Sequence, residues 1–393
     1  MLHCSFALRG FDARSHRSEP LKRAIEPSNS CPYVQTSRED DLLGRIIAAI
    51  SVIAAFAILP ARADAVSDFY RTHQITLIVG AAPGGSQDLY ARLLARHLGA
   101  FIPGNPQVVV QHMPGGGSLR AANYLYNLAP RDGTVIAMLS RNMPLIGLLG
   151  GNSNVEFKPR RFTWLGSPSS FLNDANILIV RKDAPVKSIE EARRGDLPPL
   201  VLGASADGGA GNDVPIILRD AIGLHVKQVV GFPDSPAVFV AMERGEVHGR
   251  TVDLSVLKAS KPQWLAPEGA YRVLVQFARA TRHPELPDVP TARELAKNEA
   301  ARALIELAEL PYAISRPIAA PPDLPSDRAQ ALKSAFRALQ ADAQYLDDAA
   351  GLELDISPID GEEVLRAIDR IALALPEFLD YARKLFAETR GGG

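Results

Sequence analysis

Short apolar runs alternate with segments of helical period over most of the chain. The run "ITLIVG" at 75–80 precedes a helical pattern from Gln87 to Leu98, and the run "QVVVQ" at 107–111 precedes one from Leu119 to Leu128. A third run, "GTVIAML", ends this stretch. Apolar runs of strand length between amphipathic helices are typical of parallel strands joined by crossover helices. The pattern therefore predicts an α/β fold.

The same alternation starts again at "NILIV" (176–180) and ends near "YRVLVQFA" (271–278). It includes two helical segments, from Val214 to Ile222 and from Pro236 to Arg244. Because 393 residues exceed the usual size of one hydrophobic core, we expect two α/β units rather than one. Three helical segments are expected after the second unit, at 326–342, 361–374 and 376–388.

The N-terminal region has the pattern of a secretory signal. Arg45 precedes an apolar run from Ile46 to Leu59, and Ala61-Arg62-Ala63 follows as a small-x-small cleavage sequence. The run is shorter than the roughly 20 apolar residues that span a bilayer. We expect cleavage after Ala63, with a retained N-terminal anchor as the alternative. Residues 1–43 are polar and rich in Arg and Ser, and we expect no fold from them.

Composition narrows the classes of function. The formal net charge is −1 and the chain has no run of lysine and arginine, so nucleic acid is not expected as a partner. Both cysteines, Cys4 and Cys31, precede the expected cut, so the mature chain would form no disulfide. These features predict a soluble exported protein that is stabilised by packing alone.

The residues that enzymes use for chemistry do not occur in recognisable arrangements. The eight histidines are scattered, without the spacing of metal ligands. The sequence has no Gly-x-Ser-x-Gly elbow and no Gly-Lys-Ser/Thr phosphate loop, and "GAAPGGS" does not fit the Gly-x-Gly-x-x-Gly dinucleotide spacing. We therefore expect no catalytic residue, no metal and no cofactor.

Glycine clusters stand directly before expected helices, at Gly84-Gly85, at Gly115–Gly117 and at 208–211. Glycine lets the backbone approach a ligand, and the start of a helix carries free N–H groups and a partial positive charge. Such an end is suited to binding an anion, although each cluster could equally be only a tight turn. We expect Ser86 to be the N-cap of the first helix and Gly99 its C-terminal stop.

Five segments taken in order, "ITLIVGAAPGGSQDLYARLLARHL", "MPGGGSLRAANYLYNLAPRDGTVI", "VLGASADGGAGN", "AMERGEVHGR" and "HPELPDVPTARE", resemble the Bug family, the substrate-binding proteins of tripartite tricarboxylate transporters. The resemblance covers Phe69 to Glu388. It implies a periplasmic-binding-protein type II fold, in which two α/β domains are joined by crossing strands around a ligand cleft. Residues 69–174 and 276–389 would form the first domain and 175–275 the second, after an extension and signal peptide at 1–63.

The resemblance also implies a ligand site with contacts from both domains. In its first loop, glycine and serine would offer hydrogen-bond donors, and Asp88 would hold the loop or a water. The implied ligand-binding residues are Ala81, Gly84, Gly85, Ser86, Asp88, Ser140, Arg141, Asn142, Ser205, Ala206, Gly208, Gly209, Asn212, Phe232, Pro233 and Asp253.

The chain departs from the family pattern at several of these positions. Ala81 replaces a bulky aromatic residue, and Arg141 replaces a small one. Arg141 either pairs with a ligand carboxylate or is a solvated residue at the rim. Asp207 and Asp213 would repel a dianion unless they face away. The ligand of the common family members is therefore not assumed for this chain.

These observations predict a periplasmic, monomeric protein that captures a small carboxylate by domain closure and presents it to an inner-membrane permease. It would perform no chemistry. One alternative is a sensory protein of the same fold that acts on a membrane receptor, and neighbouring genes would discriminate between the two. The other alternative, an exported enzyme, lacks a nucleophile or base in the sequence.

Overall fold

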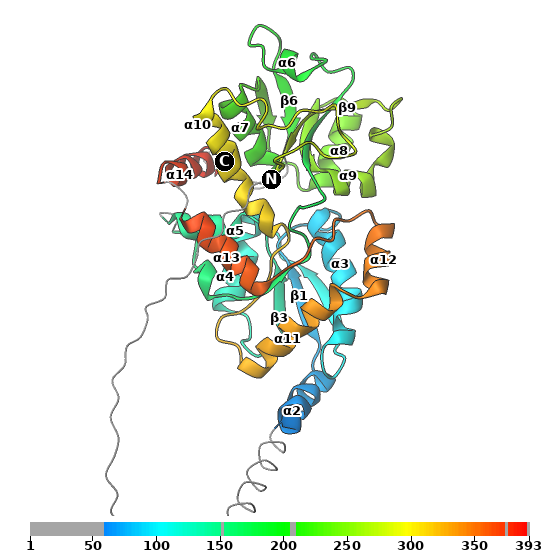
Figure 1. Ribbon diagram of the computed structural model, residues 1–393, viewed down its shortest axis with the longest axis vertical. Coiled ribbons are helices and arrows are strands. Elements are labelled where there is room, and N and C mark those ends of the chain that lie inside the picture. The colour runs from blue at the N-terminus through cyan, green and yellow to red at the C-terminus, as the bar shows by residue number, and fades with distance from the viewer. Residues whose placement is uncertain (1–58, 151–152, 205–209, 374–375, 391–393) are drawn as a thin grey trace, which may run out of the picture. The chain divides into compact units, whose positions relative to one another are not determined.

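The computed structural model describes residues 59–150, 153–204, 210–373 and 376–390 (Figure 1). The described residues all belong to one compact unit that contains two β-sheets. We call the elements around the six-stranded sheet the first lobe and those around the five-stranded sheet the second lobe. The cleavage sequence begins inside the described helix α2 (Leu59–Thr72), whereas the apolar run before it lies almost wholly outside the described residues.

The sheet of the first lobe has the strand order β11-β4-β10-β3-β1-β2. Strand β1 pairs in parallel with both β2 and β3, as the alternation of runs and helices predicts. Strand β10 enters between β3 and β4 and is antiparallel to both. The strands are β1 (Ile75–Val79), β2 (Val108–His112), β3 (Val135–Met138), β4 (Thr163–Ser167), β10 (Ile318–Ala320) and β11 (Ile359–Asp360).

Side chains of alternate strand positions in this sheet enter two different cores. In β3, Val135 and Ala137 belong to one buried cluster and Ile136 and Met138 to the other, as the two-residue period of a strand requires. The helices that cover the two faces, apart from α2, are α3 (Ser86–Leu98), α4 (Leu119–Asn127), α5 (Met143–Leu149), α11 (Ser326–Leu339), α12 (Ala343–Gly351) and α13 (Gly361–Ala372).

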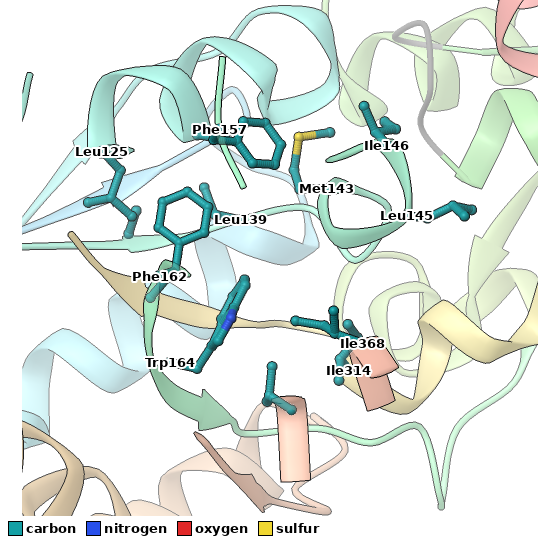
Figure 2. Close-up of a cluster of buried hydrophobic side chains, with 14 of the residues drawn as sticks. Leu125, Leu139, Met143, Leu145, Ile146, Phe157, Phe162, Trp164, Ile314 and Ile368 are labelled. Carbon is teal, nitrogen blue, oxygen red and sulfur yellow. The ribbon is translucent and has the colours of Figure 1, made fainter. Parts of the chain in front are cut away.

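Aliphatic side chains and the rings of Phe157, Phe162 and Trp164 fill one core of the first lobe (Figure 2). The Phe162 ring lies 5.6 Å from that of Phe157 and 5.5 Å from that of Trp164, measured between centroids. The Trp164 indole N–H donates to the carbonyl of Pro159 over 2.9 Å, so its one polar atom is satisfied. This packing fixes β4 and the loop that leads from it into the second lobe.

The sheet of the second lobe has the order β7-β6-β8-β5-β9. Its strands are β5 (Asn176–Arg181), β6 (Leu200–Gly203), β7 (Val226–Val229), β8 (Gly249–Asp253) and β9 (Tyr271–Phe277). Its helices are α6 (Ile189–Ala192), α7 (Ala210–Ile222), α8 (Ser235–Glu243), α9 (Leu254–Ser260) and α10 (Glu299–Glu309). Two sheets, each with strands and covering helices, confirm the predicted α/β class.

The last helix, α14 (Pro376–Arg390), contacts α5 of the first lobe and α7 of the second. Strand β9 of the second lobe ends two residues beyond position 275, where the second domain was expected to end. Helix α10, which was expected in the first domain, packs on α7 of the second lobe. The domain boundaries stay a prediction.

Short 3₁₀ helices occur at Gly99–Phe101, Gly116–Ser118, Pro159–Arg161, Pro262–Trp264 and Leu310–Ile314. Within the described ranges, no helix combines the length and apolar character needed to cross a membrane.

Two expected helix ends differ in their detail. Ser86 is the first residue of α3 and not its N-cap, which is Gly85 in an extended conformation, so the predicted serine cap is wrong. Helix α3 does end before Gly99, but Gly99 is right-handed and the chain continues as a 3₁₀ turn. The glycine is needed for a close approach, because an added Cβ would lie 2.2 Å from the Pro106 carbonyl oxygen.

Replacing Gly99 by alanine is therefore expected to lower the free energy of unfolding by about 1 to 3 kcal/mol, the usual cost of overpacking. Urea denaturation measures the loss. Gly195→Ala is the matched control, because no atom lies within 4 Å of a Cβ added there. Equal stability of the two variants would contradict the close-approach explanation.

Candidate functional site

A cavity of about 380 Å³ lies where loops of the two lobes meet. The first lobe contributes the loops that follow β1, β2 and β3, and the second contributes β8 and the starts of α7 and α8. The lining residues are Gly80, Ala81, Ala82, Gly85, Ser86, Gln87, Pro114, Gly115, Gly116, Gly117, Ser118, Ser140, Arg141, Asn176, Gly211, Pro233, Asp234, Ser235, Arg250, Thr251, Val252, Asp253, Val256, Ser315 and Arg316.

The first-lobe wall is made of two glycine loops, each before a helix. Gly85, Ser86 and Gln87 line the cavity at the start of α3, where the first N–H groups of a helix have no partner within the helix. Ser118 joins the loops: its hydroxyl donates to the Gly80 carbonyl over 3.0 Å and accepts from the Ser140 N–H over 3.1 Å. This wall presents backbone donors and the partial positive end of α3 to the cavity.

Asp88 is buried behind the first loop and does not line the cavity. Its carboxylate accepts from the Gly84 N–H, from Arg92 Nε and from His112 Nε2, each over 2.8 Å. Burial by itself would raise the pKa of this carboxyl, but the three hydrogen bonds outweigh burial and lower the pKa below its usual value. Asp88 therefore holds the loop, one of the two roles expected for it.

Replacing Asp88 by alanine should lower the free energy of unfolding by about 1 to 3 kcal/mol, because it removes three hydrogen bonds to a charged group. Since the folded pKa is lowered, the stabilisation is present above the ordinary value of 3.8 and is lost as the pH falls through the folded pKa. Urea denaturation at neutral pH and in acid measures both effects. Asp68→Ala, which removes an exposed carboxylate on α2, is the control and should change little.

Arg250 on β8 is a buried cation in the second-lobe wall, with 5% of its surface exposed. Nε donates to the Thr251 carbonyl over 3.1 Å, Nη1 to the Ser235 carbonyl over 3.1 Å and Nη2 to the Ser235 hydroxyl over 3.2 Å. The guanidinium also lies 5.1 Å from the centre of the Phe239 ring. Burial lowers the pKa of Arg250 to about 10, and the charge of Asp253 opposes this shift.

All of these hydrogen-bond acceptors are neutral. Among the described residues, no carboxylate oxygen lies within the 4.0 Å of an ion pair with Arg250. Asp253 acts on Arg250 only from beyond the distance of an ion pair. A buried charge without a partner in direct contact is costly, so the site favours an anion beside this arginine. Arg250 thus supplies the charge that the glycine loops of the opposite wall lack.

Arg141, Asp253 and Arg316 form a buried cluster across the two lobes. Arg141 Nη2 lies 2.9 Å and Arg316 Nη2 2.6 Å from Asp253 Oδ2, and Asn176 Nδ2 donates to Oδ1 over 2.8 Å. Burial would raise the pKa of Asp253, but the two guanidinium groups and the hydrogen bonds hold it well below its usual range. Arg141 has 8% of its surface exposed, so the rim alternative is wrong.

The cavity brings together seven of the sequence-predicted ligand residues: Ala81, Gly85, Ser86, Ser140, Arg141, Pro233 and Asp253. Ser205, Ala206, Gly208 and Gly209 lie outside the described residues, as does Asp207. Contact of any of these residues with a ligand stays a prediction.

Five predicted residues, Gly84 and Asp88 among them, are not in the lining. Asn142 Nδ2 donates to Asp213 Oδ2 over 2.8 Å, and this hydrogen bond links the two lobes. Neither Asn142 nor Asp213 lines the cavity. Asn212 is buried in α7, and its carbonyl accepts from Gln228 Nε2. Phe232 packs against the second-lobe core. The side-chain amide of Asn212 is buried, and neither its nitrogen nor its oxygen has a partner among the described residues. Contact of these five residues with a ligand also stays a prediction.

Sequence analysis missed Arg250, Arg316 and Asn176. The signal for Arg250 was present, because an arginine interrupts the otherwise uncharged "GRTV" strand and all five residues of β8 are buried. Arg316 precedes β10 and is separated from Asp253 by 63 positions, so no local pattern marks it. Among the described residues, no group of three or more His, Cys, Asp or Glu side chains has the arrangement of a metal site.

No family profile matches the chain. It is 27% identical over 251 residues to the UPF0065 protein in the TAR-I ttuE-ttuC' intergenic region of Agrobacterium vitis, covering 62% of this chain and 67% of that protein. It is 28% identical over 258 residues to the UPF0065 protein in the gbd 5' region of Cupriavidus necator, covering 63% and 72%.

The fold matches solved periplasmic binding proteins. The structure of BugD superposes with a TM-score of 0.62 at 18% identity, over 80% of this chain and 98% of that one. Rpa4515 of R. palustris, solved with adipate, gives 0.61 at 21% identity, over 81% and 98%. MatC (Rpa3494) of Rhodopseudomonas palustris, solved with bound malate, gives 0.57 at 18% identity, over 80% and 99%. The predicted type II fold is confirmed.

Proposed function

We propose, from the premise that this chain belongs to the Bug family of periplasmic solute-binding proteins, that it binds a small carboxylate between its two lobes and delivers it to a tripartite tricarboxylate-type permease. The chain performs no catalysis in this function. Its place of action is the periplasm, in keeping with its binding-protein relatives.

One observation supports the carboxylate most strongly. Arg250 is a buried cation at the cavity wall, and its described hydrogen-bond acceptors are all neutral. A carboxylate is the small anion whose two oxygens fit the planar donor fork of a guanidinium. On the opposite wall, the start of α3 offers backbone N–H groups for the same ligand.

The cavity and its donors suit a small metabolite. Its volume of about 380 Å³ lies within the range of small-molecule sites. Hydrogen bonds to a charged group contribute about 1.5 to 3 kcal/mol each, and micromolar binding requires roughly 8 kcal/mol. Arg250 with two or three backbone donors therefore accounts for such an affinity, whereas one glycine loop does not.

A thermal-shift screen of dicarboxylates, tricarboxylates, aromatic acids and amino acids tests the proposal. A ligand at 100 times its dissociation constant adds about 2.7 kcal/mol of stability, which shifts the unfolding temperature by a measurable amount. We expect at least one carboxylate to stabilise the protein. Failure of every carboxylate in the screen would contradict the proposed function.

Delivery from the periplasm requires export, which we infer from the apolar run and the Ala61-Arg62-Ala63 sequence. Cleavage after Ala63 leaves Val66 and Tyr70 of α2 in the mature chain, where both are buried against the first lobe. N-terminal sequencing of periplasmic material is expected to start at Asp64. Material that starts well before Asp64 would contradict the processing.

A further inference from the structure

Asp253 puts a carboxylate of the protein itself into the wall of the cavity. It stands at the end of β8 in the second lobe, and its two cationic partners, Arg141 and Arg316, come from the first lobe. These are two of the three arginines that line the cavity. In a site for anions, two of the cations are thus already paired before a ligand binds.

The pairing leaves little capacity for another carboxylate. Oδ1 of Asp253 accepts from Asn176 and Arg141, and Oδ2 accepts from Arg141 and Arg316. The other terminal nitrogen of Arg316 donates to the carbonyl and the hydroxyl of Ser315. The terminal nitrogens of both guanidinium groups therefore have acceptors without a ligand, and only Arg316 Nε is a buried donor that has no acceptor among the described residues.

The charge of the described lining points the same way. Three arginines, Arg141, Arg250 and Arg316, face two aspartates, Asp234 and Asp253. Asp234 already accepts from the Ala237 N–H at the start of α8, so its charge is held there. The described lining therefore has one more positive than negative charge, and Arg250 is the arginine that has no ion pair. A buried site accommodates a charge only where a countercharge meets it.

From this arrangement, and resting on the proposed function, we propose that Asp253 determines specificity: it takes the place of a second ligand carboxylate and restricts the ligand to one. The far end of the ligand is then neutral and donates hydrogen bonds. Asn176 Oδ1, beside Asp253, is a buried acceptor that has no donor among the described residues. An amide or hydroxyl suits this end, whereas a second carboxylate would place its oxygens next to Asn176 Oδ1 and the negative charge of Asp253.

Titration calorimetry with isosteric probes tests the inference on the mature chain. The probes are adipate and its monoamide, and succinate and its monoamide, which differ within each pair only in the charge of one end. We expect the wild-type protein to bind the preferred monoamide at least tenfold more tightly than its dianion. Asp253→Asn frees two arginines and is expected to shift this ratio tenfold or more towards the dianion. Asp196→Asn, at an exposed carboxylate paired with Arg194, is the control and should leave the ratio unchanged.

The outcomes separate this inference from the proposed function. Tighter binding of the dianions by the wild-type protein, or an unchanged ratio in a folded Asp253→Asn protein, would overturn the role of Asp253 and leave carboxylate binding intact. If no carboxylate binds the wild-type protein in this titration or in the screen above, the proposed function is overturned and the inference with it. The wild-type ratio needs no variant, so it decides the matter even if Asp253→Asn does not fold.

Discussion

Replacing Arg250 by methionine is expected to weaken carboxylate binding by about 10- to 150-fold, which corresponds to about 1.5 to 3 kcal/mol for a hydrogen bond to a charged group. Methionine is also unbranched and can cover the Phe239 ring, but it offers no donor and no charge. The lost affinity should appear for every carboxylate that binds, because Arg250 supplies the only cation of the described lining without an acidic partner. Titration calorimetry with the ligand found in the screen measures the change.

Two further variants distinguish loss of charge from loss of structure. Arg250→Lys keeps the positive charge and is expected to retain part of the affinity. Arg160→Met removes an exposed arginine that pairs with Asp369 on the surface, and should bind like the wild-type protein. A folded Arg250→Met protein with undiminished affinity would mean that the anion lies elsewhere in the cavity.

Replacing Gly85 by valine is expected to weaken binding by about 2 kcal/mol or more, roughly thirtyfold. Gly85 lines the cavity at the start of α3, so the added side chain would occupy the approach of the ligand to the N–H groups there. The fold should survive. Gly85 has φ −88 and ψ 178, which valine adopts readily, and the nearest atom to an added Cβ is the Ala82 carbonyl oxygen at 4.0 Å.

The neighbouring glycine would give a less clear result. Gly84 has φ +82, so a valine there strains the backbone and alters stability together with binding. Gly195→Val is the suitable control, since an added Cβ has no atom within 4 Å and the position is outside the cavity lining. If Gly85→Val binds as tightly as Gly195→Val, the first glycine loop is only a turn.

Most of the fold could be predicted from the sequence because its elements carry local periodic signals. The runs at β1 and β3 and the helical pattern of α3 have the lengths and periods of buried strands and an amphipathic helix, and the structure has them within a few residues. The two glycines before α3 and the three before α4 also indicated where backbone donors gather. These signals depend on neighbours in the chain, so one sequence is enough to interpret them.

The charged half of the site could not be predicted in the same way. Arg141 and Asp253 are 112 positions apart, and only the approach of the two lobes makes them partners. The same holds for Asn142 and Asp213, which are 71 positions apart and form a hydrogen bond between the lobes. The predicted N-cap of α3 was wrong for a local reason. The extended Gly85 takes the N-cap position, and Asp88 accepts a hydrogen bond from the Gly84 N–H of the same loop.

The central claim is that an anion of the ligand is held between Arg250 and the start of α3. Titration of the wild-type protein with a carboxylate from the screen and with its neutral primary amide tests this claim most directly. We predict one-to-one binding of the carboxylate and binding of the amide weaker by at least tenfold. Equal binding of the amide and the carboxylate would contradict the account.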